Sequence, residues 1–147
     1  MKKLVPFVLL LAMLAATLCS CIGDETEGAN LGDYNVDIES IRVDADDEGT
    51  PIAIVKYKFT NHSDSAECFY MAVDTYAYQN GIELFRCFTA EAAGYSEEDH
   101  ERNVKPGYSI EVEVAYELDD PSADVEIEVV KSFSIRNRKI TKTFTLQ

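Results

Sequence analysis

The sequence predicts an all-β protein, an antiparallel β-sandwich of seven or eight strands. From residue 34 onward, apolar and polar residues alternate with a period of two, as they do in strands with one buried and one wet face. Clusters of turn-forming residues separate these runs, and no long stretch has helical spacing. Asn80-Gly81 lies between two apolar runs and is the strongest short hairpin signal, because both central positions of a type I′ turn need positive φ.

Four strands are predicted in the first half of the domain. They cover residues 34–43, 51–60, 69–79 and 82–88. In the first strand the apolar residues change phase, which indicates a β-bulge near Glu39-Ser40. The last two strands flank Asn80-Gly81 and form its hairpin.

The second half continues with three predicted strands, at residues 108–118, 125–133 and 139–146. Residues 89–103 interrupt the alternation and are expected to form a helical turn or a long loop. The pattern is clearest in residues 108–118, where Ile110, Val112, Val114, Tyr116 and Leu118 share one face. A hairpin around Asn137-Arg138 connects the last two strands.

The Asn80-Gly81 hairpin has two distinct faces. If Asn80-Gly81 is a two-residue turn, the residue numbers of two residues that pair across the strands add up to 161. Tyr76 then faces Phe85, and Tyr78 faces Glu83. The core face would carry Phe69, Met71, Val73, Ala77, Ile82, Leu84 and Phe88. The other face carries Tyr70, Tyr76, Tyr78 and Phe85, and it is either a partner-binding face or a wet face stabilised by aromatic cross-strand pairs.

The N-terminus has the three parts of an export signal: Lys2 and Lys3, an apolar run to Leu18, and a small residue before a cysteine. The run of about 15 residues is too short to span a bilayer, which needs roughly 20. Leu18, Cys19 and Ser20 precede Cys21, whose thiol would take a diacylglyceryl group before cleavage. We therefore expect a lipoprotein signal peptide at 1–20, a lipidated acidic tether at 21–33, and a domain at 34–147 on the extracytoplasmic face of the cell membrane. An ordinary signal cleaved nearby is the alternative.

Composition limits the partners. The chain carries 13 basic and 27 acidic residues, and removal of Lys2 and Lys3 leaves 11 against 27, a net charge of −16. Such a surface repels nucleic acid, so we expect none as partner. The acidity either forms a solvated shell or favours a basic protein or envelope ligand.

Few residues carry recognisable chemistry. The acidic run Asp44–Glu48 precedes Gly49 as in a calcium loop, but position 12 of an EF-hand would be Val55, so we expect a solvated turn or at most a weak cation site. His62 and His100 lie in polar loops, and no metal or cofactor is predicted.

Cys68 and Cys87 are expected to be free thiols. With paired positions that sum to 161, Cys87 lies opposite Asp74, roughly 20 Å along the ladder from Cys68 at ~3.4 Å per residue. A disulfide requires Cα atoms within about 7 Å.

Five short runs carry a family resemblance: LGDY at 31–34, VKYKFTN at 55–61, QNGIEL at 79–84, VKPGYS at 104–109 and AYELDD at 115–120. In their order and spacing they resemble a domain-of-unknown-function family of lipoproteins, found mainly in Gram-positive bacteria. The resemblance implies an immunoglobulin-like sandwich and no catalytic residue. We therefore expect a lipid-anchored, non-catalytic binding or accessory module with an unknown ligand. The alternatives are a small envelope hydrolase and a structural or stress-related envelope protein.

Overall fold

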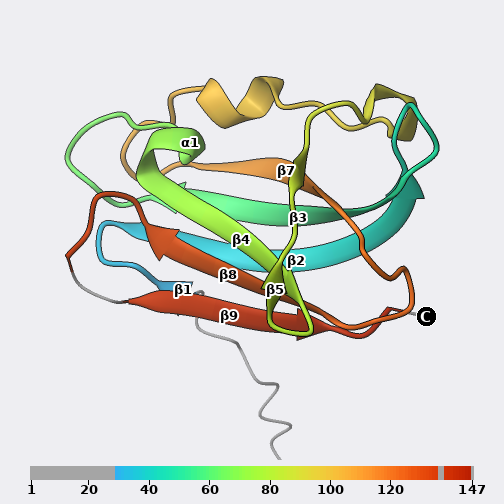
Figure 1. Ribbon diagram of the computed structural model, residues 1–147. Helices are drawn as coiled ribbons and strands as arrows, with labels where there is room; N and C mark the ends of the chain where they lie inside the picture. Colours follow the sequence, from blue (N-terminus) through green and yellow to red (C-terminus); the bar gives the residue numbers. More distant parts are fainter. Residues whose placement is uncertain (1–28, 136–137, 147) are drawn as a thin grey trace, which may run out of the picture.

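Two antiparallel sheets packed face to face form the domain (Figure 1), which confirms the predicted all-β sandwich. The computed structural model describes residues 29–135 and 138–146. One sheet has the order β1-β2-β3-β7-β6, with β1 Ala29–Asn30, β2 Tyr34–Ala45, β3 Pro51–Asn61, β7 Ser109–Glu117 and β6 Arg86–Cys87. The other has the order β5-β4-β8-β9, with β5 Ile82–Glu83, β4 Val73–Gln79, β8 Val125–Lys131 and β9 Lys139–Phe144.

The chain passes between the two sheets three times. β1, β2 and β3 belong to the first sheet, β4 and β5 to the second, β6 and β7 to the first, and β8 and β9 to the second. The chain thus leaves one sheet after β5 and joins the other at β6, which lies beside β7.

The core lies between the sheets and follows the predicted alternation. Val112, Val114 and Tyr116 of β7 are buried, as are Val125, Ile127 and Val129 of β8. β2 and β3 pair from Tyr34↔Asn61 to Ala45↔Pro51, and their register shifts between Ile38 and Ser40, where the bulge was predicted.

The predicted strand at 69–79 begins later than expected. Phe69–Ala72 forms a single helical turn, α1, and extended backbone starts at Val73. Because residues three apart share a helix face, Phe69 and Ala72 are buried while Met71 is exposed. The prediction that Met71, Ile82 and Phe88 lie in the core is therefore wrong, and Ile82 is 64% exposed.

The predicted strand at 82–88 is divided between the two sheets. β5 keeps the expected register, Tyr78↔Glu83, and the Leu84 N–H still donates to the Ala77 carbonyl at 2.8 Å. The next carbonyl, of Phe85, accepts from the Glu117 N–H of β7 at 2.8 Å, so the chain has crossed to the other sheet. Figure 1 shows this segment running from the β4–β5 hairpin at the bottom to β7 at the top.

This crossing corrects two sequence-based pairings. Phe85 does not pair with Tyr76, which lies opposite Glu128 of β8. Cys87 lies opposite Ala115 of β7 rather than opposite Asp74.

The folded domain begins before Tyr34, because β1 pairs with β2 and Leu31 is buried, so residues 29–33 are not tether. Residues 89–103 contain two short 3₁₀ helices, η1 Glu91–Ala93 and η2 Glu98–Glu101, as the broken alternation indicated. The predicted signal, Cys21 and Asn137 of the last hairpin lie outside the described residues. Within 29–135 and 138–146, no helix has the length and apolarity to cross a bilayer.

Candidate functional site

A pocket of about 280 Å³ opens at the edge where the chain crosses between the sheets. Its walls come from residues 69–71 of α1, residues 73–76 of β4, Arg86 of β6, and Ser132 and Phe133 after β8. The pocket thus joins both sheets with α1, which forms because the chain turns helically before β4. The Ser132 N–H donates to the Ala72 carbonyl at 3.0 Å and fixes the β8–β9 connection against α1.

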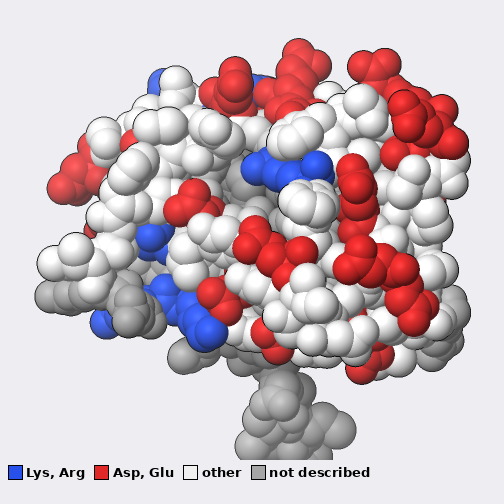
Figure 2. Space-filling model, in the orientation of Figure 1, with Lys and Arg blue, Asp and Glu red and all other residues white. Residues whose placement is uncertain are grey.

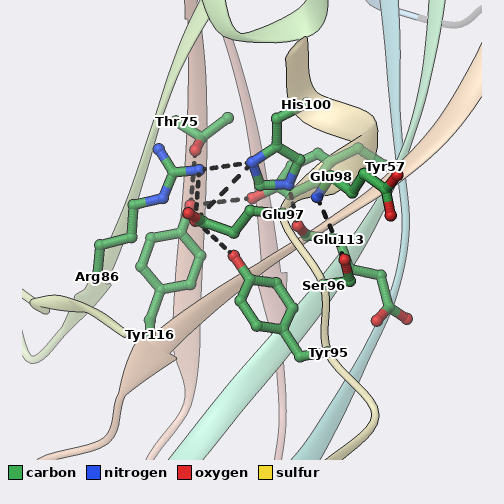
Figure 3. A network of polar contacts seen from close by, with 10 residues as sticks. All are labelled: Tyr57, Thr75, Arg86, Tyr95, Ser96, Glu97, Glu98, His100, Glu113 and Tyr116. Atoms are coloured by element: carbon green, nitrogen blue, oxygen red, sulfur yellow. Dashed lines mark hydrogen bonds and ion pairs between the residues drawn. The ribbon is translucent and has the colours of Figure 1, made fainter. Parts of the chain in front are cut away.

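Arg86 is held from one side. Its Nη2 lies 3.1 Å from Nδ1 of His100 and 3.5 Å from Oε1 of Glu97 (Figure 3). Its guanidinium carbon lies 5.7 Å from the centre of the Phe88 ring, a cation–π distance. The Nε atom is buried and has no hydrogen-bond partner among the described residues. The guanidinium is therefore oriented through Nη2 by His100 and Glu97, while Nε is left without a partner among the described residues.

His100 orients Arg86 as a neutral base. Its Nε2 donates to the Glu113 carbonyl, so Nδ1 carries the lone pair that accepts from Arg86. Burial lowers the pKa of His100 below its usual 6.5, and the positive charge of Arg86 lowers it further. The rings of Phe69 and Tyr95 pack on the imidazole, with centres 5.9 and 6.4 Å away. Both nitrogens are committed to positioning.

Glu97 connects the loop of 3₁₀ helices to the same network. Its Oε1 accepts from the Tyr95 hydroxyl at 2.8 Å and neighbours the Arg86 guanidinium (Figure 3). Burial, together with this carboxylate, raises the pKa of Tyr95 far above its ordinary value, so the phenol stays protonated and donates. Residues 95–100 are thereby tied to Arg86.

A second set of hydroxyls leads from the core to the pocket wall. The Tyr116 hydroxyl donates to Thr75 Oγ1 at 2.7 Å, and the Tyr57 hydroxyl lies 3.3 Å from that of Tyr116. Burial raises the pKa of Tyr57 well above 10, so both phenols remain neutral donors. Since Thr75 accepts from Tyr116 and lines the pocket, its own proton can be donated to a ligand.

A known protein family covers most of this chain. Residues 20–131 match the model described as Domain of unknown function (DUF5067). The chain belongs to this family. A solved structure described as "a putative lipoprotein from Staphylococcus aureus" has the same fold, with a TM-score of 0.56 at 14% identity over 77% of this chain and 83% of that one. No curated protein matches the sequence.

Ser132 and Phe133 complete the pocket of this DUF5067 domain. Ser132 is buried, and its Oγ has no hydrogen-bond partner among the described residues. Phe133 has a φ of +54°, which is a strained value for a bulky side chain, and the residue is 92% exposed. The turn after β8 thus contributes two consecutive residues to the pocket wall, one with a buried hydroxyl and one with an exposed aromatic side chain.

Two of the four residues of the predicted partner-binding face lie at the pocket. Tyr70 and Tyr76 line the pocket, Tyr70 exposed and Tyr76 half-buried. Tyr78 lies further along β4 opposite Glu83, and Phe85 is exposed on the crossing segment. Neither of these two residues lines the pocket.

Sequence reasoning missed Arg86, although one signal pointed to it. Arg86 is the only Lys or Arg in residues 59–101, a stretch with nine Asp and Glu. Figure 2 shows basic atoms in a hollow near the centre of the α1–β4 side, among uncharged atoms and with acidic side chains further out. Such an isolated cation in an acidic stretch is a candidate binding residue.

The other candidates from sequence are Asp46, His62, Cys68 and Cys87, and none of them lines the pocket. Oδ1 of Asp46 accepts from the N–H groups of Glu48 and Thr50, at 2.9 and 2.7 Å, and these bonds lower the pKa of Asp46. His62 is exposed in the loop after β3. In the part of the chain that the structure describes, no group of three His, Cys, Asp or Glu could hold a metal ion. Cys68 and Cys87 are buried free thiols, but the register argued for them was wrong, because Cys87 belongs to the other sheet.

Proposed function

We propose that this protein is a lipid-anchored, extracytoplasmic binding module that holds its ligand in the pocket between α1, β4 and Arg86 without transforming it. The observation that supports the proposal is the pocket itself, where buried donors of Arg86 and Ser132 lack partners among the described residues. Concave sites with apolar walls and a few convergent polar groups are the usual form of small-ligand sites.

The absence of turnover is inferred from what the polar side chains already do. His100 would be the natural general base, yet one nitrogen is bonded to the Glu113 carbonyl and the other to Arg86. The Ser132 hydroxyl has no base positioned on it within the described residues. These contacts favour a binding site over the small envelope hydrolase.

The proposed location rests on Cys21 and on the relatives. The family match spans Cys21, and the structure with the same fold is described as "a putative lipoprotein". We further propose that the chain belongs among immunoglobulin-like lipoproteins of Gram-positive bacteria. The strand order supports this, because β2-β3-β7-β6 and β5-β4-β8-β9 correspond to the orders A-B-E-D and C′-C-F-G of an immunoglobulin-like sandwich.

Intact mass of the full chain extracted from bacterial membranes tests the anchor. We expect a mature protein that begins at Cys21 and carries acyl groups, and Cys21→Ala should remain an unlipidated precursor. A mature mass without acyl groups, or one that begins elsewhere, would contradict the anchor.

Photo-crosslinking in the native cell tests the binding function. A photoreactive amino acid replaces Tyr70 at the pocket or, as the matched control, Tyr108, an exposed tyrosine outside it. We expect a discrete adduct from position 70 that Arg86→Gln removes. The same adducts from both positions, or none from position 70, would contradict the proposal.

A further inference from the structure

The turn between β8 and β9, of which the structure describes residues 132–135 and 138, carries the two most exposed large apolar side chains of the described residues. Phe133 is 92% exposed and Ile135 is 101% exposed. Phe133 also has a φ of +54°, which costs conformational energy in a bulky residue. Exposed apolar side chains that gather on one loop mark a contact with a protein or a membrane. Strain and exposure at the same residue therefore indicate that a partner covers this turn.

The basic residues of the chain are concentrated around the same turn. After Glu128 the sequence has five Lys or Arg and no Asp or Glu, whereas the whole chain has 13 basic and 27 acidic residues. Lys131 and Lys139, at the two sides of the turn, are paired with Asp33 and Glu128 at 2.5 and 2.8 Å. Arg138 is exposed and has no ion pair within the described residues. Figure 2 shows a group of basic atoms at the lower left, at the end of the sandwich where this turn lies.

The turn also lies beside the point where the chain enters the domain from its proposed anchor. Figure 1 shows β1 and the β8–β9 turn at the same end of the sandwich, on the left. Only residues 22–28 separate Cys21 from Ala29 of β1, and an extended chain of this length spans at most about 30 Å. A small cavity joins the residues after β1 to the turn, and it is lined by Leu31, Gly32, Asp33, Lys131, Ser134 and Arg138. A lipid at Cys21 would therefore hold this end of the domain close to the bilayer.

Neighbouring acidic residues limit what charge alone can contribute at this end. The His62 N–H donates to the Asp33 carbonyl at 2.8 Å, which brings the loop after β3, with Asp64 and Glu67, to the same end. Acidic residues further away act weakly on a membrane, because the Debye length is about 8 Å at physiological ionic strength. The apolar side chains are therefore the main contact, and Arg138 adds to it where the lipids are anionic.

We infer that the β8–β9 turn rests on the bilayer that holds the lipid anchor, with Phe133 and Ile135 at the boundary of headgroups and acyl chains and Arg138 at anionic headgroups. The inference goes beyond ligand binding and rests on the proposed lipid anchor. Because the anchor already keeps the domain at the membrane, a second, weak contact is enough to orient it. Phe133 also lines the pocket, so in this orientation the pocket opens near the bilayer.

Tryptophan fluorescence of the full lipidated chain in vesicles tests the inference. The sequence contains no Trp, so Phe133→Trp introduces a single reporter. Phe85→Trp is the matched control, because Phe85 is 79% exposed and its carbonyl accepts from Glu117, at the end of β7 away from the turn. The vesicles contain phosphatidylcholine and phosphatidylglycerol, with or without bromine on the acyl chains. We expect the emission of position 133 to shift to shorter wavelength and to lose most of its intensity with brominated lipid, and the emission of position 85 to do neither.

Further changes in the Phe133→Trp chain separate the apolar contact from the charge. Ile135→Ser should weaken the quenching at position 133, and Ile82→Ser, at a residue 64% exposed on β5, should not. Arg138→Gln should lower the ratio of docked to undocked protein about five-fold in vesicles with phosphatidylglycerol, and little in phosphatidylcholine alone. Arg102→Gln, whose side chain is exposed outside the turn, is the control for charge.

The intact mass of the same preparation separates failure of the inference from failure of the anchor. Unquenched emission at position 133 in a chain that carries acyl groups would overturn the inference and leave the anchor standing. A shift to shorter wavelength without bromine quenching would mean that protein covers the turn, and equal quenching at positions 133 and 85 would mean that the domain has no preferred orientation. Either result would also overturn the inference. If the mass shows no acyl groups, the anchor falls and the inference falls with it.

Discussion

The sandwich has two lateral edges, one formed by β2 and β9 and the other by β4 and β6, and they differ in whether unpaired polar groups find partners within the chain. At the β2–β9 edge, Lys142 of β9 reaches across to β2 and donates to the Ile38 carbonyl at 2.7 Å and to the Glu39 carbonyl at 3.2 Å. Glu39 is the bulged residue that the β2–β3 register skips. At the β4–β6 edge, Arg86 and Ser132 keep buried donors without partners among the described residues.

The difference shows how the same architecture can close one edge and leave a pocket at the other. A bulge leaves backbone groups without ladder partners, and the β2–β9 edge satisfies them from within the chain. The opposite edge opens because the chain crosses between sheets there and α1 replaces the start of a strand. Polar atoms that the fold could have paired or omitted remain buried at that edge, at a stability cost, in two residues that line the pocket.

The largest expected effect tests the core that both edges share. Val112→Asp places a carboxylate between the sheets, where Val112 is buried, and should lower the free energy of unfolding by about 4 kcal/mol or more. Urea unfolding measures the change. Glu117→Lys, on the exposed face of the same strand, should change stability by less than about 0.5 kcal/mol. A small loss for Val112→Asp would mean that the two sheets do not pack as described.

The next largest effect concerns Gln79, which stabilises the β4–β6 side of the sandwich by hydrogen bonds. Gln79 is buried at the end of β4, its Oε1 accepts from the N–H groups of Asp119 and Asp120, and its Nε2 donates to the carbonyls of Asp120 and Ala123. Gln79→Leu leaves these backbone groups unpaired and should cost about 2–4 kcal/mol in urea unfolding. Thr141→Ala, exposed on β9, is the control. Near-equal stability of the two variants would contradict the role of Gln79.

A smaller effect concerns the support of Arg86. Burial lowers the pKa of His100 in the folded protein, so the unfolded chain binds more protons at this residue. The contribution of His100 to the free energy of unfolding is therefore fully present above pH 6.5. It is lost as the pH falls from 6.5 through the pKa of the folded state. His100→Gln should therefore flatten the decline of unfolding free energy below pH 6.5, and His62→Gln in its exposed loop should not. Parallel pH curves for wild type and His100→Gln would show that His100 is not buried as a neutral base.

Most strands follow from the sequence because period-two alternation fixes which face is buried, as in residues 108–118. Asn80-Gly81 likewise fixes the β4–β5 register. The pocket could not be predicted, because it depends on two departures from alternation: a helical turn at Phe69–Ala72 and a crossing at Leu84–Phe85. Tertiary packing decides both departures, because the periodicity of a short apolar segment does not distinguish a helix from a strand. Arg86 and Ser132 belong to different sheets, and only the crossing brings them together.

The paired stability of Lys142→Met and Ser132→Ala tests most directly whether one edge is closed for stability and the other left open for a ligand. Lys142→Met leaves the Ile38 and Glu39 carbonyls without their donor and should lower the free energy of unfolding by about 1 kcal/mol. Ser132→Ala removes a buried hydroxyl without a partner among the described residues, so stability should stay the same or rise by up to about 1 kcal/mol in ligand-free protein. Urea unfolding of both variants beside wild type gives the two signs. A loss for Ser132→Ala as large as that for Lys142→Met would contradict the account.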